Sequence, residues 1–542
     1  MKLAAHRGNR IHAPENTRAA LLSGFTSGAD VLQFELQLTA DGFLVLSADP
    51  TTDRLTGKPG TIGELTLAEL KALDVSKTFL PRGSPGFKYR PPHRKQLQIE
   101  TFPELLELLP DEVSLLVELP AEAAKAGRGD ELVTKAVQAL ADRGLVERTV
   151  VYSRDPELLA AARKLAPGLR VATYAPEASG VDQVAGMKAA GADGLVGGFG
   201  AFVGADGKPT TAGEQLAQAN LAVGAALVSD RDPPVPTEAE YQAAGSLAFV
   251  WSLATASTFD VASFAYPSWT WLAESFAGKN IDTDRIWVGY AKANKYAHVY
   301  QDDGLHVDIA PYDGVEPDPQ DEVHQELEAL LERTWFALTD WPFYSGGGLG
   351  VVAGIDGSFA AEIDFAADRA CQATMCELAV TNVDPGANQP PWNDDGTPRL
   401  PQTIRNKAAF YNPHGAPPFV GSEHDEDDGY RINWNLGSEY DDNQYGRPVG
   451  DGTVLSGRFR LERRANFFAS YYRNTVDATD WVCVGTIRND SMNRRVYLRC
   501  AGKRWRQELE TDPTKFYPVV PNNFVFKNLE IVRPVGAPDS EG

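Results

Sequence analysis

The chain reads Ala5-His6-Arg7-Gly8-Asn9-Arg10-Ile11-His12-Ala13-Pro14-Glu15-Asn16-Thr17 close to its start. Two further blocks follow along the chain: residues 28–42, G-A-D-V-L-Q-F-E-L-Q-L-T-A-D-G, and residues 49–54, D-P-T-T-D-R. These three linked blocks are the strongest signal for the fold, and the pattern of the residues around them points to the same fold class.

Around these blocks, short apolar runs alternate with segments of helical pattern such as residues 131–145. The apolar runs are residues 44–46, 114–117, 149–152, 169–173, 194–196, 222–228 and 247–251. This alternation is typical of βαβ units in a parallel sheet. A count of about eight strands favours a (β/α)8 TIM barrel, which we expect over residues 1–260.

The second half of the chain has a different composition. All 10 tryptophans lie at or after Trp251, which indicates that two units have been joined. Short alternating strands and turn-rich loops predict an antiparallel β-sandwich over residues 261–542. Residues near 319–338 are an exception, because their apolar side chains repeat at helical spacing and predict an inserted helix.

The three N-terminal blocks resemble the motifs of the glycerophosphodiester phosphodiesterase family, whose first barrel strand ends in His-Arg-Gly before a Pro-Glu-Asn-Thr loop. The resemblance covers roughly residues 3–255. It implies cleavage of a phosphodiester by two imidazoles, one accepting and one donating a proton. It also implies a divalent cation, Ca²⁺ or Mg²⁺, held by carboxylates at the strand ends.

The same resemblance implies roles for individual residues. His6 stands at the position of the first catalytic imidazole and Arg7 at that of a phosphate-binding group. Glu15 and Asn16 stand in the substrate site. The carboxylates implied for the metal are Glu35, Asp49 and Glu118.

The sequence departs from the family pattern at the catalytic centre. The Glu-x-Asp metal pair is Gln33-Phe34-Glu35 here, the His-Asp dipeptide is Ala48-Asp49, and the Glu-x-Lys strand end is Glu118-Leu119-Pro120. A neutral Gln33 removes one charge from a hard-cation site, and Ala48 cannot donate a proton to the leaving alkoxide. His12 would have to replace the missing imidazole, or else it is a polar surface residue.

These departures predict a pseudoenzyme, a recognition or structural protein with little or no catalysis. The retained His6, Arg7 and Asn16 then form either a vestigial ligand pocket or hydrogen-bonded ties between strand ends. The alternative is an active, metal-dependent phosphodiesterase that acts on glycerophosphodiesters or teichoic-acid-like polymers.

Stretches of the second half resemble concanavalin-like jelly-roll domains of the laminin-G kind. They are residues 276–287, 301–307, 459–463, 467–472 and 480–485. The resemblance implies a lectin-like sandwich and a glycan or cell-envelope polymer as partner, although the same fold also hosts glycosidases and adhesion modules.

An acidic and aromatic stretch follows within this half. Asp425, Asp427 and Asp428 either chelate Ca²⁺ or belong to a solvated loop. Neighbouring aromatic residues either stack on a sugar or enter the core; they are Tyr430, Trp434 and Tyr440. A glycosidase is a further alternative, with two carboxylates drawn from Glu439, Asp441 and Asp442.

Charge and hydropathy exclude two classes of partner. With 51 Lys and Arg against 74 Asp and Glu, the net charge of −23 repels nucleic acid and anionic membranes. The sequence contains no signal-peptide pattern and no apolar run of about 20 residues, so we expect no membrane span and synthesis in the cytoplasm. A lectin-like unit has most use outside the cell. We therefore also expect a homo-oligomer or larger assembly, carried out as part of a particle such as a phage tail.

The cysteines are too few for a disulfide scaffold, at 4 in 542 residues. Cys483 and Cys500 flank residues 490–493, so a hairpin there would bring them face to face across neighbouring strands. Direct cross-strand neighbours are about 4.5–5.5 Å apart at Cβ, longer than in a usual disulfide. We therefore predict two buried thiols.

Overall fold

The structure is a computed structural model in which two compact units account for the described residues, 2–253 in the first and 268–534 in the second. The described residues are 2–10, 12–79, 97–110, 112–174, 180–198, 208–218, 223–227, 250–253, 268–282, 284–289, 297–309, 311, 345–369, 374–382, 418–425, 429–436, 444–445, 454–473, 481–504, 508–509, 511–516 and 520–534. The predicted boundary at residue 260 and the predicted helix near 319–338 lie outside them.

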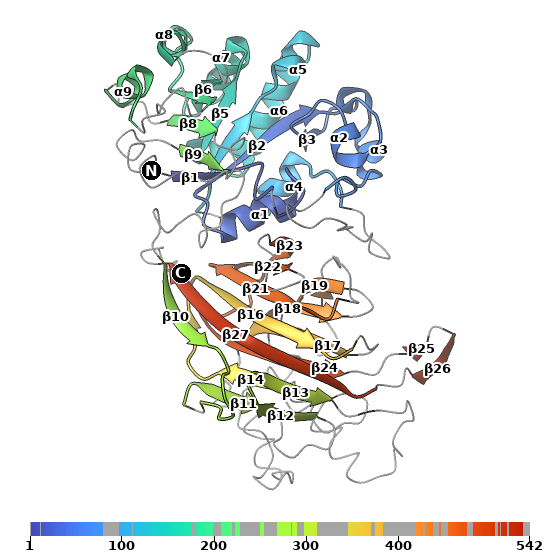
Figure 1. Ribbon diagram of the computed structural model, residues 1–542. Helices are drawn as coiled ribbons and strands as arrows, with labels where there is room; N and C mark the ends of the chain where they lie inside the picture. Colours follow the sequence, from blue (N-terminus) through green and yellow to red (C-terminus); the bar gives the residue numbers. More distant parts are fainter. Residues whose placement is uncertain are drawn as a thin grey trace. The chain divides into compact units, whose positions relative to one another are not determined.

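The first unit is built on parallel strands whose pairing closes into a ring (Figure 1). Its eight parallel strands are β1 (Lys2–His6), β2 (Val31–Leu38), β4 (Ser114–Glu118), β5 (Thr149–Ser153), β6 (Arg170–Tyr174), β7 (Gly194–Gly198), β8 (Val223–Leu227) and β9 (Val250–Leu253). The predicted parallel α/β architecture is confirmed. The run at 44–46 departs from that pattern, because it forms β3 (Leu44–Leu46), which pairs antiparallel with the far end of β2 outside the ring.

Helices connect these strands, and local sequence signals explain where they begin. The α-helices are α1 (Arg18–Thr26), α2 (Asp53–Thr56), α3 (Leu67–Lys71), α4 (Phe102–Leu106), α5 (Ala121–Lys125), α6 (Gly129–Asp142), α7 (Pro156–Leu165), α8 (Gly180–Ala189) and α9 (Thr211–Gln218); the 3₁₀ helices are η1 (Ile62–Glu64) and η2 (Val146–Arg148). Thr17 caps α1 by accepting a hydrogen bond from the Ala20 backbone N–H. Thr101 and Glu104 form a reciprocal capping box at the start of α4.

The interior of the ring is filled by side chains from successive strands. One core cluster consists of Ala4, Val31, Leu116, Val150, Tyr152, Ala172 and Val196. Side chains two residues further along these strands point to the same face. The carboxyl-terminal ends of β1, β2 and β4 therefore direct His6, Gln33 and Glu118 toward one place, the end of the barrel where sites form in this fold.

The second unit consists mainly of two antiparallel sheets (Figure 1). The first sheet contains β12 (Ala297–Gln301), β13 (Leu305–Ile309), β27 (Asn522–Pro534), β16 (Phe359–Ala367), β21 (Ser456–Arg464), β22 (Phe467–Arg473) and β23 (Val482–Arg488), with β10 (Ser268–Glu274) beside β27. The second contains β11 (Ile286–Gly289), β14 (Ser345–Val351), β24 (Arg495–Arg504), β17 (Thr374–Thr381), β18 (Phe419–Asp425), β19 (Gly429–Asn435) and β20 (Gln444–Tyr445), with β15 (Ile355–Asp356) beside β24. A separate pair is formed by β25 (Glu508–Leu509) and β26 (Asp512–Phe516).

One hydrophobic core joins the two sheets. It contains Ile363 and Phe459 from the first sheet together with Leu378 and Val420 from the second. Alternate residues of the strands face this core, as expected for sheets packed face to face. The predicted antiparallel β-architecture is confirmed, and the specific jelly-roll topology stays a prediction.

The prediction for the cysteines is half right. Cys483 and Cys500 are buried and free, as expected. They are not cross-strand neighbours, because β23 pairs with β22 in the first sheet whereas β24 pairs with β14 and β17 in the second. The turn at 490–493 thus carries the chain from one sheet to the other.

Within the described part of the chain, no helix has the length and apolar character needed to cross a membrane.

Candidate functional site

The loop after β1 adopts an unusual backbone conformation. Arg7 and Asn16 both have left-handed backbones, with φ of 58° and 56°, and Gly8 between them has φ of 76°. A Cβ on Gly8 would lie 2.4 Å from the carbonyl carbon of Ala20 in α1, so only glycine fits this close approach. Non-glycine residues held in this region of backbone space cluster at functional sites.

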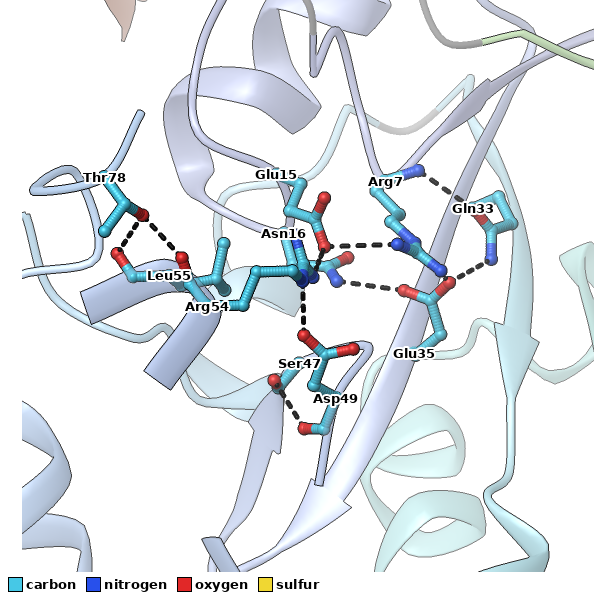
Figure 2. A network of polar contacts seen from close by, with 10 residues as sticks. All are labelled: Arg7, Glu15, Asn16, Gln33, Glu35, Ser47, Asp49, Arg54, Leu55 and Thr78. Atoms are coloured by element: carbon cyan, nitrogen blue, oxygen red, sulfur yellow. Dashed lines mark hydrogen bonds and ion pairs between the residues drawn. The ribbon is translucent and has the colours of Figure 1, made fainter. Parts of the chain in front are cut away.

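Arg7 reaches from this loop to two carboxylates (Figure 2). Its Nε donates to Glu35 Oε1 at 2.8 Å and its Nη1 to Glu15 Oε1 at 3.2 Å. Burial alone would lower the pKa of Arg7, but the charges of Glu35 and Glu15 outweigh it and raise that pKa. The guanidinium is therefore a permanent positive charge, only partly exposed, at the mouth of the barrel.

Glu35 on β2 is held by several donors at once. Besides Arg7, Asn16 Nδ2 donates to its Oε2 at 2.9 Å and Gln33 Nε2 to its Oε1 at 3.1 Å. Glu35 is almost fully buried. This buried carboxylate thus accepts hydrogen bonds from three different side chains.

The amide of Gln33 has a defined orientation. Its Oε1 accepts the backbone N–H of Arg7 at 3.0 Å, while its Nε2 donates to Glu35 and, at 2.6 Å, to the hydroxyl of Tyr152. A backbone N–H can only donate and a carboxylate can only accept, so the oxygen must face Arg7 and the nitrogen must face Glu35.

Glu118 ends β4 beside Glu35, its register partner on β2. Burial, together with the charge of Glu35, raises the pKa of Glu118 to about 7. Tyr152 on β5 is the register partner of Glu118, and burial next to the two carboxylates raises the pKa of its hydroxyl. Tyr152 is therefore a neutral hydrogen-bonding group at neutral pH.

The guanidinium of Arg54 also contacts Glu15 (Figure 2). Arg54 of α2 donates through Nη2 to Glu15 Oε1 at 2.6 Å and through Nε to Asp49. Thr78 Oγ1 donates to the Arg54 carbonyl at 2.6 Å and anchors the end of this short helix. Glu15 is thus shared by two arginines, and Asp49 is paired with one of them.

The groups relevant to proton transfer are His6, His12 and Ala48. Burial, with the nearby positive charges of Arg7 and Arg10, lowers the pKa of His6 well below its ordinary value. The imidazole is therefore neutral at neutral pH and can accept a proton. His12 is buried, not a surface residue, and its Nδ1 lies 3.1 Å from Asn9 Nδ2. Ala48 follows β3 and carries no titratable group.

These donors do not fit a divalent cation. Among the described residues, no group of three or more His, Cys, Asp and Glu side chains is placed to hold a metal ion. Glu35 and Asp49 are each paired with an arginine, and Gln33 presents N–H groups, not its oxygen, to Glu35. Hard cations require several oxygen ligands at short range.

The structure brings most of the predicted N-terminal site residues together. Arg7, Glu15, Asn16, Glu35 and Asp49 belong to one network (Figure 2), which includes Gln33 at the position of the departed metal ligand. Sequence reasoning missed two members, Arg54 and Tyr152. Arg54 is the last residue of the third block, so the motif could have identified it. Tyr152 lies in a strand that contains no motif.

The structure does not bring the predicted C-terminal site residues together in a site. Tyr430 is fully buried and stacks on Tyr472 with ring centroids 3.6 Å apart, so it is a core residue and cannot stack on a sugar. Trp434 is partly buried against the same core, and Asp425 ends β18. The remaining predicted residues lie outside the described part of the chain: Asp427, Asp428, Glu439, Tyr440, Asp441 and Asp442.

Comparison with known proteins assigns the barrel to a class. Residues 6–225 match the glycerophosphoryl diester phosphodiesterase family. The N-terminal region is therefore homologous to this family, and the match ends before the β-sheet unit begins.

Individual proteins with a glycerophosphodiester phosphodiesterase name are also similar to this chain. A glycerophosphodiester phosphodiesterase of Caldanaerobacter subterraneus subsp. tengcongensis is 32% identical over 168 residues, 31% of this chain and 63% of that protein. The putative glycerophosphodiester phosphodiesterase YhdW of Bacillus subtilis is 31% identical over 132 residues, 24% of this chain and 50% of that protein. The chain thus spans between half and two thirds of these relatives. A crystal structure of glycerophosphodiester phosphodiesterase from Agrobacterium tumefaciens aligns with 22% identity and a TM-score of 0.38, over 48% of this chain and 98% of that one.

Proposed function

We propose that the barrel is a recognition unit that binds a phosphodiester of the glycerophosphodiester class and hydrolyses it slowly or not at all. One observation carries this proposal: the binding groups of the site are present, whereas Ala48 stands where the second proton-transfer group is needed. Arg7 and Arg54 supply positive charge at the site of an otherwise acidic chain.

Two unsatisfied polar atoms support a ligand pocket over simple ties between strand ends. His6 Nδ1 and Asn16 Oδ1 are buried and have no hydrogen-bond partner among the described residues. Buried polar atoms of this kind are uncommon and call for a bound molecule or an ordered water. His6 precedes Arg7 in the chain, and the backbone N–H of Asn16 donates to the Arg7 carbonyl at 3.0 Å, so both atoms belong to residues next to the group suited to a phosphate.

The chemistry explains why turnover is expected to be slow. Neutral His6 can take one proton, but the leaving alkoxide also needs a proton, and Ala48 cannot give one. A single positioned acid or base contributes about 10²–10⁴-fold to a rate. We therefore expect the full chain to be at least about a hundredfold slower than the Caldanaerobacter relative.

The test follows release of glycerol phosphate from a glycerophosphodiester, with Mg²⁺ or Ca²⁺ added. Binding of sn-glycerol 3-phosphate, measured by calorimetry, should weaken in Arg7→Ala but not in Arg18→Ala, a partly exposed arginine of α1. The double substitution Gln33→Glu with Ala48→His should raise turnover above that of the wild type. Wild-type turnover equal to that of the relative would contradict the proposal.

An active metal-dependent phosphodiesterase is the second candidate. It is favoured by His6, Arg7 and Glu118, which the barrel retains at its strand ends. Its cofactor would be Ca²⁺ or Mg²⁺, and its substrates glycerophosphodiesters or teichoic-acid-like polymers. Cation-dependent release of glycerol phosphate at the relative's rate would select this candidate.

For the β-sheet unit we propose binding of a glycan or cell-envelope polymer within a homo-oligomer or a particle such as a phage tail, after synthesis in the cytoplasm. The support is two facing antiparallel sheets, an architecture that lectin-like domains share. Many copies would turn weak contacts into avidity. A glycan array tests binding and sedimentation tests assembly; a strict monomer that binds no glycan would remove the basis for this proposal.

A further inference from the structure

We propose that the hydrogen-bonded chain Glu35–Gln33–Tyr152, at the strand ends beside Glu118, takes the place of a divalent cation in the barrel, so that the site is complete without one. The inference deepens the proposed function and rests on it for the identity of the site. It concerns what satisfies the buried Glu35 carboxylate, and not whether the ligand is cleaved.

Strand register brings these residues together. Glu35 on β2 is paired with Glu118 on β4, and Glu118 is paired with Tyr152 on β5. Gln33 lies two residues before Glu35 and so points to the same side of β2. The ends of three neighbouring strands thus place two carboxylates, one amide and one phenol on the same side of the sheet.

The hydrogen bonds run in a consistent direction. Gln33 Nε2 donates to Glu35 at 3.1 Å and to the Tyr152 hydroxyl oxygen at 2.6 Å. Glu118 is the register partner of both Glu35 and Tyr152. The Gln33 amide, together with Asn16 and Arg7, therefore satisfies the Glu35 carboxylate, a role that a cation fills in a site made of oxygen ligands.

A cation would have to undo this arrangement. To offer its oxygen toward Glu35, the Gln33 amide would have to turn over. Its N–H₂ group would then face the backbone N–H of Arg7, which now donates to Oε1 at 3.0 Å as well as to the Gln33 main-chain carbonyl at 2.9 Å. Two donors facing each other cannot form a hydrogen bond. Arg7 would also have to release Glu35, to which it donates at 2.8 Å.

The decisive substitution is Gln33→Glu. It replaces a donor by an acceptor between two carboxylates and supplies the third oxygen-bearing charge that a cation site needs. Gln37→Glu is the matched control, because it adds the same charge on the same strand at a partly exposed position outside the network.

The experiment measures Mn²⁺ binding by electron paramagnetic resonance and the thermal midpoint with EDTA or with millimolar Mg²⁺, Ca²⁺ or Mn²⁺, all on the full chain. We expect the wild type and Gln37→Glu to show the same weak Mn²⁺ binding and no cation-dependent midpoint. Gln33→Glu should bind Mn²⁺ at least about tenfold more tightly, and its midpoint should rise with the cation by a few degrees.

Wild-type Mn²⁺ binding as tight as that of Gln33→Glu, or tight binding that Glu118→Gln abolishes, would overturn the inference. The second comparison needs no folded Gln33→Glu protein. Failure of this inference is distinguishable from failure of the proposed function: tight Mn²⁺ binding without hydrolysis contradicts only this inference, and fast hydrolysis in EDTA contradicts only the proposed function.

Discussion

At the scale of single residues, the site depends on conformations that few side chains allow. Gly8 lies against α1 with a positive φ. Arg7 and Asn16, in the same loop, both donate to Glu35. Steric fit at one glycine thus determines where the guanidinium is directed.

We predict that Gly8→Ala lowers the free energy of unfolding by about 2–4 kcal/mol, because a left-handed backbone disfavours alanine and the new Cβ overlaps the α1 backbone. Gly127→Ala is the control: Gly127 has φ of 73°, but nothing lies within 4 Å of its Cβ position. It should cost only about 1 kcal/mol. Urea unfolding measures both, and equal losses would show that the contact with α1 does not matter.

A second prediction concerns the carboxyl of Glu118, whose pKa of about 7 lies above the ordinary value for a glutamate. The folded state therefore binds more protons than the unfolded state between about pH 4.3 and 7, and stability falls as pH rises through that window. Glu118→Gln removes this cost and should raise the free energy of unfolding by about 1–3 kcal/mol near pH 8.

The gain in Glu118→Gln should vanish below about pH 4.3, where the wild-type carboxyl is protonated in both states. Glu122→Gln, a substitution at an exposed position of α5, serves as the control for loss of a charge alone. Urea unfolding across this pH range measures the difference. If Glu118→Gln raised the free energy of unfolding by the same amount at every pH, titration of Glu118 would not be the source of the pH dependence.

At the scale of elements, the hairpin of β18 and β19 carries buried charge on the face of its sheet that points away from the core. Glu423 is fully buried and forms an ion pair with Arg431, its cross-strand neighbour. Asn433 donates to the same carboxylate. The acidic stretch, which in sequence fits either a Ca²⁺ site or a solvated loop, therefore begins inside a strand.

We predict that Arg431→Ala costs about 3–5 kcal/mol of folding free energy, because it removes the guanidinium from a carboxylate that is out of water. Arg488→Ala is the control, since Arg488 pairs with Asp490 at an exposed position and should cost less than about 1 kcal/mol. Chemical unfolding measures both. If Arg431→Ala lost as little free energy of unfolding as Arg488→Ala, water would have to reach Glu423 after the substitution.

At the scale of the whole molecule, the family match covers only one of the two units. The barrel carries the family match, which ends at residue 225. The β-sheet unit places its last strand, β27, between β13 and β16, so this sheet is completed only when the end of the chain is in place. Pairing between positions so distant in sequence is slow to form, because the connecting loop must close first.

The sequence by itself determined the class of the first unit and the polarity of its site. The blocks at residues 5–17, 28–42 and 49–54 carry the family signal, and apolar runs that alternate with helical segments identify the strands, because these features depend only on neighbours along the chain. The same local reasoning pointed to Arg7, Glu15, Asn16 and Glu35, which the fold gathers into one network.

Only the tertiary structure decided how those groups are connected. Gln33 reads in sequence as a lost metal ligand, yet in the fold it donates to Tyr152, a residue 119 positions away. In sequence, Tyr430 fits either a sugar-stacking site or the core, and the packing of two sheets decides for the core by burying it against Tyr472. Register between strands and contact between sheets arise from burial and hydrogen bonding across the whole unit, and no short stretch of sequence contains both partners.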